Sequence, residues 1–153
     1  MKKIFFIVFF LFLSQNVYSN TWTIKEYKDE FKGESVKYSI SNQVNPNIPL
    51  DFPYGDMKVE FIKVCDSTNM ILHFTHDPNL LEGELNEKEY STFYVDVKLD
   101  GKFEKLLLRQ EWGSKNLHIR NTESLINVNE FMIQLKHYGG TRHYKFNLSD
   151  LPC

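Results

Sequence analysis

The sequence predicts an all-β fold from three features: alternating apolar and polar residues, segments of strand length, and turn residues between those segments. Alternation places successive side chains on opposite faces, so one face of each strand is expected to be buried. Only one short segment after the N-terminus favours a helix. We therefore expect an antiparallel, β-sandwich-like domain with one short helix, formed as a single domain by residues 20–153.

The N-terminus predicts a signal peptide. Lys2 and Lys3 precede an apolar run from Ile4 to Leu13, and the small-residue segment Val17–Ser19 follows. A membrane-spanning helix needs about 20 apolar residues, whereas this run has ten, so cleavage after Ser19 is favoured over a stable membrane anchor. We expect residues 1–19 to be removed and the mature protein to be periplasmic or secreted.

The first strands are expected on either side of a proline-rich loop. Residues 43–56 contain three prolines and a glycine, which cannot form a regular strand interior. This loop should join an N-terminal strand pair to two alternating segments at 57–61 and 70–74. Residues 77–90 are polar and acidic and predict a second long loop, a type of segment that is often functional.

Two β-hairpins are predicted in the second half of the chain. Asp100-Gly101 can take the positive φ values of a type I′ turn, which predicts a hairpin over 92–110. Gly139-Gly140 turns the alternating segment 131–136 into a last strand at 144–148.

The one helix is expected between these hairpins, over residues 121–127. Asn121 or Thr122 could cap its first turn, and Leu125 and Ile126 supply one apolar edge. So narrow an apolar edge limits the helix to one or two turns.

The charge of the mature chain argues against nucleic acid as a partner. Loss of Lys2 and Lys3 leaves 16 basic and 20 acidic residues, a net charge of about −4 with neutral histidines. Opposite charges are interspersed, with no block of five like signs, so a polybasic membrane-binding patch is also not supported.

The cysteine count predicts one long-range disulfide. Cys65 and Cys153 are the two cysteines of the chain, and an even count in an oxidising compartment indicates pairing. The bond would close a loop of 88 residues and tie the C-terminus to the middle of the domain. A reactive thiol is the alternative, but the chain has no CxxC motif to favour it.

Catalytic and metal-binding residues are weakly indicated. His73 and His76 are three positions apart, and on a strand such a pair points to opposite faces, which argues against a shared metal ion. Gly113-Ser114 is not within a GxSxG motif, and the carboxylates of 82–89 lie in a polar loop where solvation is expected. The sequon at Asn147 falls within a predicted strand and is discounted. We therefore expect no enzyme activity and no cofactor.

A binding surface is the remaining functional expectation. His137 and His143 flank the Gly-Gly turn beside Arg142, and polar side chains at a hairpin tip are ordinarily exposed. His118 is expected to point outward from a strand. Trp112, beside Gly113, could fill the core edge or offer a flat platform to a ligand, and the core edge is favoured because tryptophan buries a large area. Trp22, Tyr27 and Phe31 admit the same two interpretations. The candidate surface residues are Trp112, His137, Arg142, His143, Glu82 and Glu84.

Several short motifs, taken in order, resemble a family of small exported bacterial proteins. They are Trp22 with Asp29-Glu30-Phe31, the segment Met57–Cys65 followed by Asp66-Ser67, Trp112-Gly113-Ser114, and the ending Tyr144–Leu151 before Cys153. The family includes type VI secretion-associated periplasmic proteins and, more distantly, invasion-associated locus B proteins. Its members pair an early cysteine with a late one after a phrase similar to Phe-Asp-Leu-Ser-Gly-Leu, where this chain has Asn147 for Asp and Asp150 for Gly.

The resemblance implies an accessory or binding role in the bacterial envelope, with a protein partner and no catalytic residues. A second hypothesis is a periplasmic inhibitor or immunity protein that blocks a cell-wall hydrolase or a toxin, with residues 77–90 as its insertion loop. A hydrolase, the third, would need a nucleophile and a base within hydrogen-bond reach. The oligomeric state is left open by the sequence.

Overall fold

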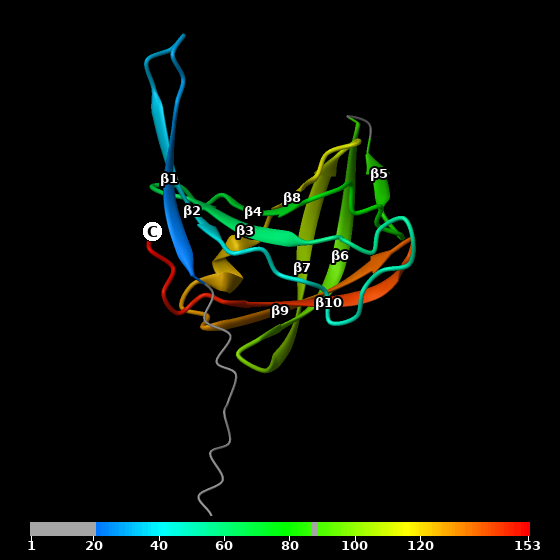
Figure 1. Cartoon of the computed structure of the whole chain (residues 1–153). Coiled ribbons are helices and arrows are strands. Elements are labelled where there is room, and N and C mark those ends of the chain that lie inside the picture. Colours follow the sequence, from blue (N-terminus) through cyan, green and yellow to red (C-terminus); the bar gives the residue numbers. More distant parts are fainter. Residues whose placement is uncertain (1–20, 87–88) are drawn as a thin grey trace, which may run out of the picture.

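The computed structural model describes residues 21–86 and 89–153, so the predicted signal peptide lies outside the described residues. The strands of this part of the chain are β1 (Trp22–Lys28), β2 (Ser35–Ser41), β3 (Val59–Val64), β4 (Met70–Phe74), β5 (Glu84–Asn86), β6 (Tyr90–Leu99), β7 (Lys102–Glu111), β8 (Asn116–Ile119), β9 (Glu130–His137) and β10 (Gly140–Asn147). A 3-10 helix, η1 (Thr122–Leu125), lies between β8 and β9 (Figure 1). Among the described residues, no helix has the length and apolar character needed to cross a membrane.

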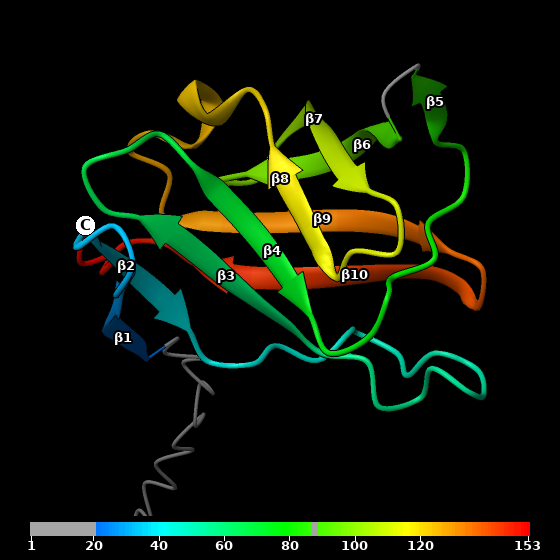
Figure 2. The same ribbon diagram turned by 90° about the horizontal axis from the view of Figure 1, so that it is seen from above.

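The strands form one antiparallel sheet that is folded over on itself. The order is β1-β2-β3-β4-β8-β7-β6-β9-β10, with β5 paired to β6. Strands β3, β4 and β8 form one layer, which crosses β9 and β10 at an angle in Figure 2, and the long strands β6 and β7 connect the two layers. The predicted all-β, sandwich-like architecture is confirmed.

The core lies between the two layers, where the inward half of each alternating strand is buried. Its centre is an aromatic cluster formed by strands distant in sequence. The Phe61 ring of β3 lies 5.9 Å from that of Phe131 on β9 and 5.7 Å from that of Phe146 on β10, measured between centroids. Trp22 of β1 contacts the other side of Phe61 at 6.0 Å in an edge-on arrangement. Burial of these rings joins the two layers.

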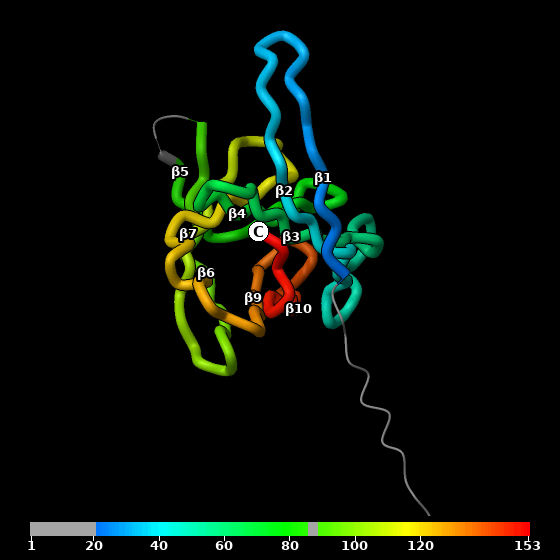
Figure 3. The backbone as a smooth tube through the Cα atoms, turned by 90° about the vertical axis from the view of Figure 1, so that its left-hand side faces the viewer, coloured from blue at the N-terminus to red at the C-terminus, as the bar shows by residue number. Residues whose placement is uncertain are grey.

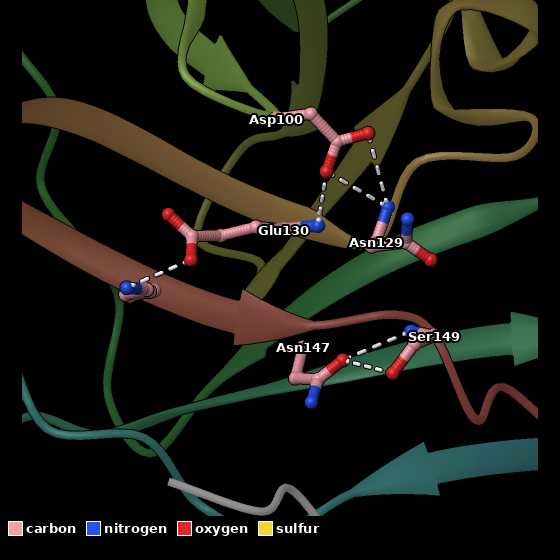
Figure 4. A network of polar contacts seen from close by, with 6 residues as sticks. Asp100, Asn129, Glu130, Asn147 and Ser149 are labelled. Carbon is pink, nitrogen blue, oxygen red and sulfur yellow. Dashed lines mark hydrogen bonds and ion pairs between the residues drawn. The ribbon is translucent and has the colours of Figure 1, made fainter. Parts of the chain in front are cut away.

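The turn at Asp100-Gly101 has the geometry predicted for it. Both residues have positive φ, 48° and 82°, as a type I′ turn requires. The Asp100 carboxylate also accepts hydrogen bonds from the backbone N–H groups of Asn129 at 3.1 Å and Glu130 at 2.8 Å (Figure 4). The β6–β7 turn is thereby fixed to the beginning of β9.

Two predictions of local structure need correction. Residues 77–90 are not entirely loop, because β5 pairs with β6 and the backbone N–H of Leu81 donates to the Lys136 carbonyl of β9 at 2.8 Å. A three-residue strand is too short to give an alternation signal. The predicted helix is present as η1, but the Asn121 side chain does not cap it and instead accepts a hydrogen bond from the Leu107 N–H at 2.9 Å.

The predicted disulfide is confirmed. Cys65, after the end of β3, bonds to Cys153, after the end of β10, with their Cα atoms 5.2 Å apart. The buried hydroxyl of Ser39 on β2 donates a hydrogen bond of 2.9 Å to the Cys153 sulfur. Three strands therefore meet where the chain ends.

Candidate functional site

A shallow groove crosses the outward face of β6, β9 and β10. It consists of two adjoining hollows of about 130 and 260 Å³, both of which Asp96 and Gln134 line. We call them together the outer groove. Glu82, Tyr94 and Lys136 contribute to the smaller hollow, and Phe103, Met132 and His143 to the larger one.

The strand register brings these side chains together. Ile133 and Leu135 of β9 are buried in the core, so Met132, Gln134 and Lys136 point outward by alternation. Lys98 of β6 is the register partner of both Phe103 on β7 and Met132 on β9. A row of outward side chains thus crosses β7, β6 and β9, and β9 is distant in sequence from the hairpin that the other two form.

The apolar part of the outer groove is unusually exposed. Phe103 is 77% exposed, although its ring is a large apolar surface, and Tyr94 is also exposed. The Lys98 ammonium lies 4.5 Å from the Phe103 ring centroid, a cation–π contact that leaves one face of the ring free. Exposed aromatic side chains on a rigid strand are typical anchors for a partner.

Paired polar groups surround the apolar surface. Asp96 forms an ion pair with Lys105 at 3.1 Å, and Glu82, in the segment before β5, pairs with Lys136 at 2.7 Å. His143 Nε2 lies 3.2 Å from the side-chain oxygen of Gln134. The outer groove therefore has an apolar centre and a hydrogen-bonding rim, as protein-binding sites do.

The predicted surface residues do not form one site. Glu82 and His143 line the outer groove, but Glu84 lies on β5 opposite Thr92 and outside the lining. The Arg142 guanidinium donates to the Pro49 carbonyl at 2.9 Å, so it holds the proline-rich loop against β10. Its role is structural.

The prediction that Trp112 fills the core edge is wrong, since this side chain is 66% exposed. It precedes Gly113, whose φ of 68° turns the chain after β7, and it lies beyond the register that β6 and β7 share. Trp112 is not among the residues that line the outer groove. Of the N-terminal aromatic residues, Trp22 packs against the core whereas Tyr27 and Phe31 are exposed. His118 is exposed, as expected.

Three groove residues on β6, β7 and β9 were not predicted from the sequence. Tyr94, Phe103 and Met132 are large apolar side chains at outward positions of predicted strands. Their place on the polar half of the alternation was a usable signal. The pairing of β6 with β9, which gathers them, is not encoded locally.

His137 is buried and not exposed, contrary to the prediction for a hairpin tip. It is 2% exposed because the segment that begins at Pro78 lies over this end of β9. The His137 Nδ1 atom lies 2.6 Å from the Pro78 carbonyl oxygen, and Nε2 lies 3.0 Å from the Tyr144 hydroxyl. A neutral ring satisfies both, with Nδ1–H donating to Pro78 and Nε2 accepting from Tyr144.

Burial sets the protonation of this pair. It lowers the pKa of His137, since a charged imidazolium is disfavoured away from water, and it raises the pKa of Tyr144. Both groups stay neutral at physiological pH and are enclosed by protein. The His137–Tyr144 contact therefore stabilises the fold and is not placed to act on a ligand.

We expect the His137 side chain to make the protein less stable in mild acid. The unfolded chain takes up a proton near pH ~6.5, whereas the folded chain resists until lower pH, so the free energy of unfolding should fall as the pH drops from about 7 to about 5. Urea unfolding at several pH values measures this slope. His137→Gln should flatten it. An unaltered slope in His137→Gln would contradict the assignment.

His73 and His76, the candidate metal ligands, contact different partners. His73 Nδ1 lies 2.7 Å from the Asn116 side-chain oxygen, whereas His76 Nε2 lies 3.1 Å from a carboxylate oxygen of Asp56. The hydrogen bond from His76 lowers the pKa of the Asp56 carboxyl. Within 21–86 and 89–153, no three His, Cys, Asp or Glu side chains are grouped to hold a metal ion.

We compared the chain with protein-family models, curated proteins and solved structures, and none of them matches it. The outer groove offers a partner both apolar and polar contacts.

Proposed function

We propose that the protein is an exported, non-enzymatic binding protein of the bacterial envelope that holds a protein partner in the outer groove. The observation that carries this proposal is the row of outward side chains on paired strands, with Phe103 exposed at its β7 end. The Cys65–Cys153 disulfide supports export, because such bonds persist in oxidising compartments. The resemblance of the chain ending to exported envelope proteins supports the same location.

The state of the ionisable groups favours binding over catalysis. A catalytic acid or base needs access to substrate and commonly a shifted pKa. The buried His137 and Tyr144 have shifted pKa values but bond to each other beneath the surface. In the outer groove, Asp96 and Glu82 already have lysine partners. These groups are suited to orienting a partner.

The charges indicate what the partner should present. Among the described residues, Lys98 forms no ion pair, and its ammonium lies over the ring face of Phe103. A partner with an apolar side chain beside a carboxylate would cover Phe103 and pair with Lys98. We propose this combination as the recognition element.

Two groove variants should abolish partner capture. Phe103→Ala removes the anchor and Met132→Asp places a charge on the apolar surface, so either should reduce the partner retained from a periplasmic extract by about tenfold or more. Retention on immobilised protein, quantified by mass spectrometry, measures the loss.

Tyr138→Ala is the matched control, because Tyr138 is 78% exposed and does not line the outer groove. It should retain the partner at the wild-type level. Equal retention by Phe103→Ala and the wild type would reject the groove as the binding site.

An inhibitor or immunity protein against a cell-wall hydrolase or toxin is a second proposal. It is favoured by one observation: Leu81 is bonded to β9, so the exposed Glu82 and Glu84 that follow are carried by an anchored segment. Recovery of a hydrolase in stoichiometric complex, inhibited by the wild type and not by Glu82→Gln/Glu84→Gln, would support this role. A captured partner without hydrolytic or toxic activity would count against it.

A further inference from the structure

The β1–β2 hairpin projects from the body of the domain as an arm (Figures 1 and 3). Strand β2 pairs with β3 at Tyr38–Ile40, and the Lys37 carbonyl accepts a hydrogen bond from the Cys65 N–H at 2.9 Å. Between these contacts and the turn, the hairpin has no third strand among the described residues. We define the arm as residues 24–37. A hairpin of two strands is marginally stable in water. The arm would therefore be stabilised by a further strand.

The outer edge of β1 offers the hydrogen-bonding groups that such a strand needs. Within the described part of the chain, β1 pairs with β2 alone. The N–H of Asp29 donates to Glu34 across the hairpin at 2.8 Å, so the odd-numbered residues of β1 bond inward. The N–H and C=O groups of Ile24, Glu26 and Lys28 consequently point outward.

At the other end of the sheet, the hydrogen-bonding edge of β10 is covered by the proline-rich loop. The outward N–H of His143 on β10 donates to the Asn47 side chain at 2.8 Å, and the His143 carbonyl accepts from the Asn47 N–H at 2.9 Å. The proline-rich loop thus covers the β10 edge, as proteins commonly do to block further pairing. The β1 edge has no such cover among the described residues, and it carries exposed Ile24 and Tyr27.

We propose that β1 pairs antiparallel with β1 of a second copy, across a two-fold axis at Tyr27. Opposite residues of an antiparallel pair share a face, so the axis must pass midway between the two copies of one β1 residue. Centred on Tyr27, the pairing places Glu26 opposite Lys28 of the second copy, and the symmetry repeats this ion pair. It also places the two Tyr27 side chains next to each other on one face of the sheet, so that each ring covers part of the other.

The charge pattern selects this register. An axis at Lys25 or Glu26 would oppose like charges, and an axis at Ile24 would form no ion pair, because Glu26 would then lie opposite Trp22. The hydrogen bonds agree, since Glu26 and Lys28 are both residues whose backbone groups point outward. Sequence and backbone geometry therefore specify the same partner, a second copy of this chain.

The proposal can be tested by exchanging charges. Sedimentation equilibrium of the disulfide-bonded protein, residues 20–153, should give a dimer. Lys28→Glu places Glu26 opposite a glutamate and should raise the dimer dissociation constant by about tenfold or more, and Glu26→Lys should do the same. The double exchange Glu26→Lys/Lys28→Glu restores both ion pairs and should return the constant to near the wild-type value.

Cross-linking checks the register. Two Tyr27→Cys residues facing each other would have Cα atoms about 4.5 Å apart, within disulfide range, so oxidation should yield a covalent dimer. Lys25→Cys, on the same face, is the matched control, because its two copies would be about 14 Å apart and should not cross-link.

Three outcomes would overturn the proposal. They are a protein that stays monomeric at millimolar concentration, a dimer unaffected by Lys28→Glu, and equal cross-linking of the two cysteine variants. Pairing of β1 with a strand of another protein would appear as the first of these. The β1 edge lies at the far end of the strand order from β10. Failure of the dimer proposal would therefore leave the proposed partner site in the outer groove unaffected.

Discussion

Replacing both Cys65 and Cys153 by serine is expected to lower the free energy of unfolding by about 4 kcal/mol. The bond closes a loop of 88 residues, and its loss restores that freedom to the unfolded chain. The native state also loses the connection between the chain end and β3. Urea unfolding of the oxidised wild type and the double variant measures the difference.

The wild type reduced with dithiothreitol is the matched control, because it lacks the bond and retains the native sequence. It should unfold close to the double variant. Ser39→Ala keeps the bond and removes only the hydrogen bond to the Cys153 sulfur, so its loss should be about 1 kcal/mol. A double variant within that same margin of the wild type would show that the bond does not stabilise the domain.

Phe61→Ala should cost a similar amount, about 4 kcal/mol, by a different mechanism. Its ring is fully buried and contacts Trp22, Phe131 and Phe146, so truncation opens a cavity where β1, β3, β9 and β10 meet. The loss should appear as a lower urea midpoint with an unchanged dependence on denaturant.

Phe31→Ala provides the comparison at the same residue type. Phe31 is 97% exposed at the tip of the arm, so its truncation should change stability by about 0.5 kcal/mol or less. Phe61→Leu, which retains most of the side-chain volume, should lie between these two. Equal stability of Phe61→Ala and Phe31→Ala would contradict the central position of the aromatic cluster.

Local sequence signals were sufficient for most of the strands. The alternation at 70–74 and the turn at Asp100-Gly101 predicted β4 and the β6–β7 hairpin, and the cysteine count predicted the disulfide. These signals act between neighbouring residues or through a single pair. The pairings β4–β8 and β6–β9 join strands separated by other elements, so no local pattern specifies them.

The candidate site was harder to predict for the same reason. The hairpin-tip argument for His137 failed because burial there depends on Pro78, a residue distant in sequence. The large area of Trp112 and its neighbour Gly113 favoured the core edge, but the turn at Gly113 directs the chain away and leaves Trp112 exposed. The outer groove depends on Phe103 and Met132 meeting beside Lys98, which only the folded sheet brings about.

The cover over the β10 edge has a consequence for the order in which the chain can fold. It joins Asn47 to His143 and Pro49 to Arg142, contacts separated by 96 and 93 residues. Folding that depends on contacts so distant in sequence is slow. The proline-rich loop, residues 43–56, cannot reach its native surroundings until β10 has been synthesised. A chain threaded N-terminus first through a narrow channel would therefore travel unfolded, and would close its sheet only after its final residues had emerged.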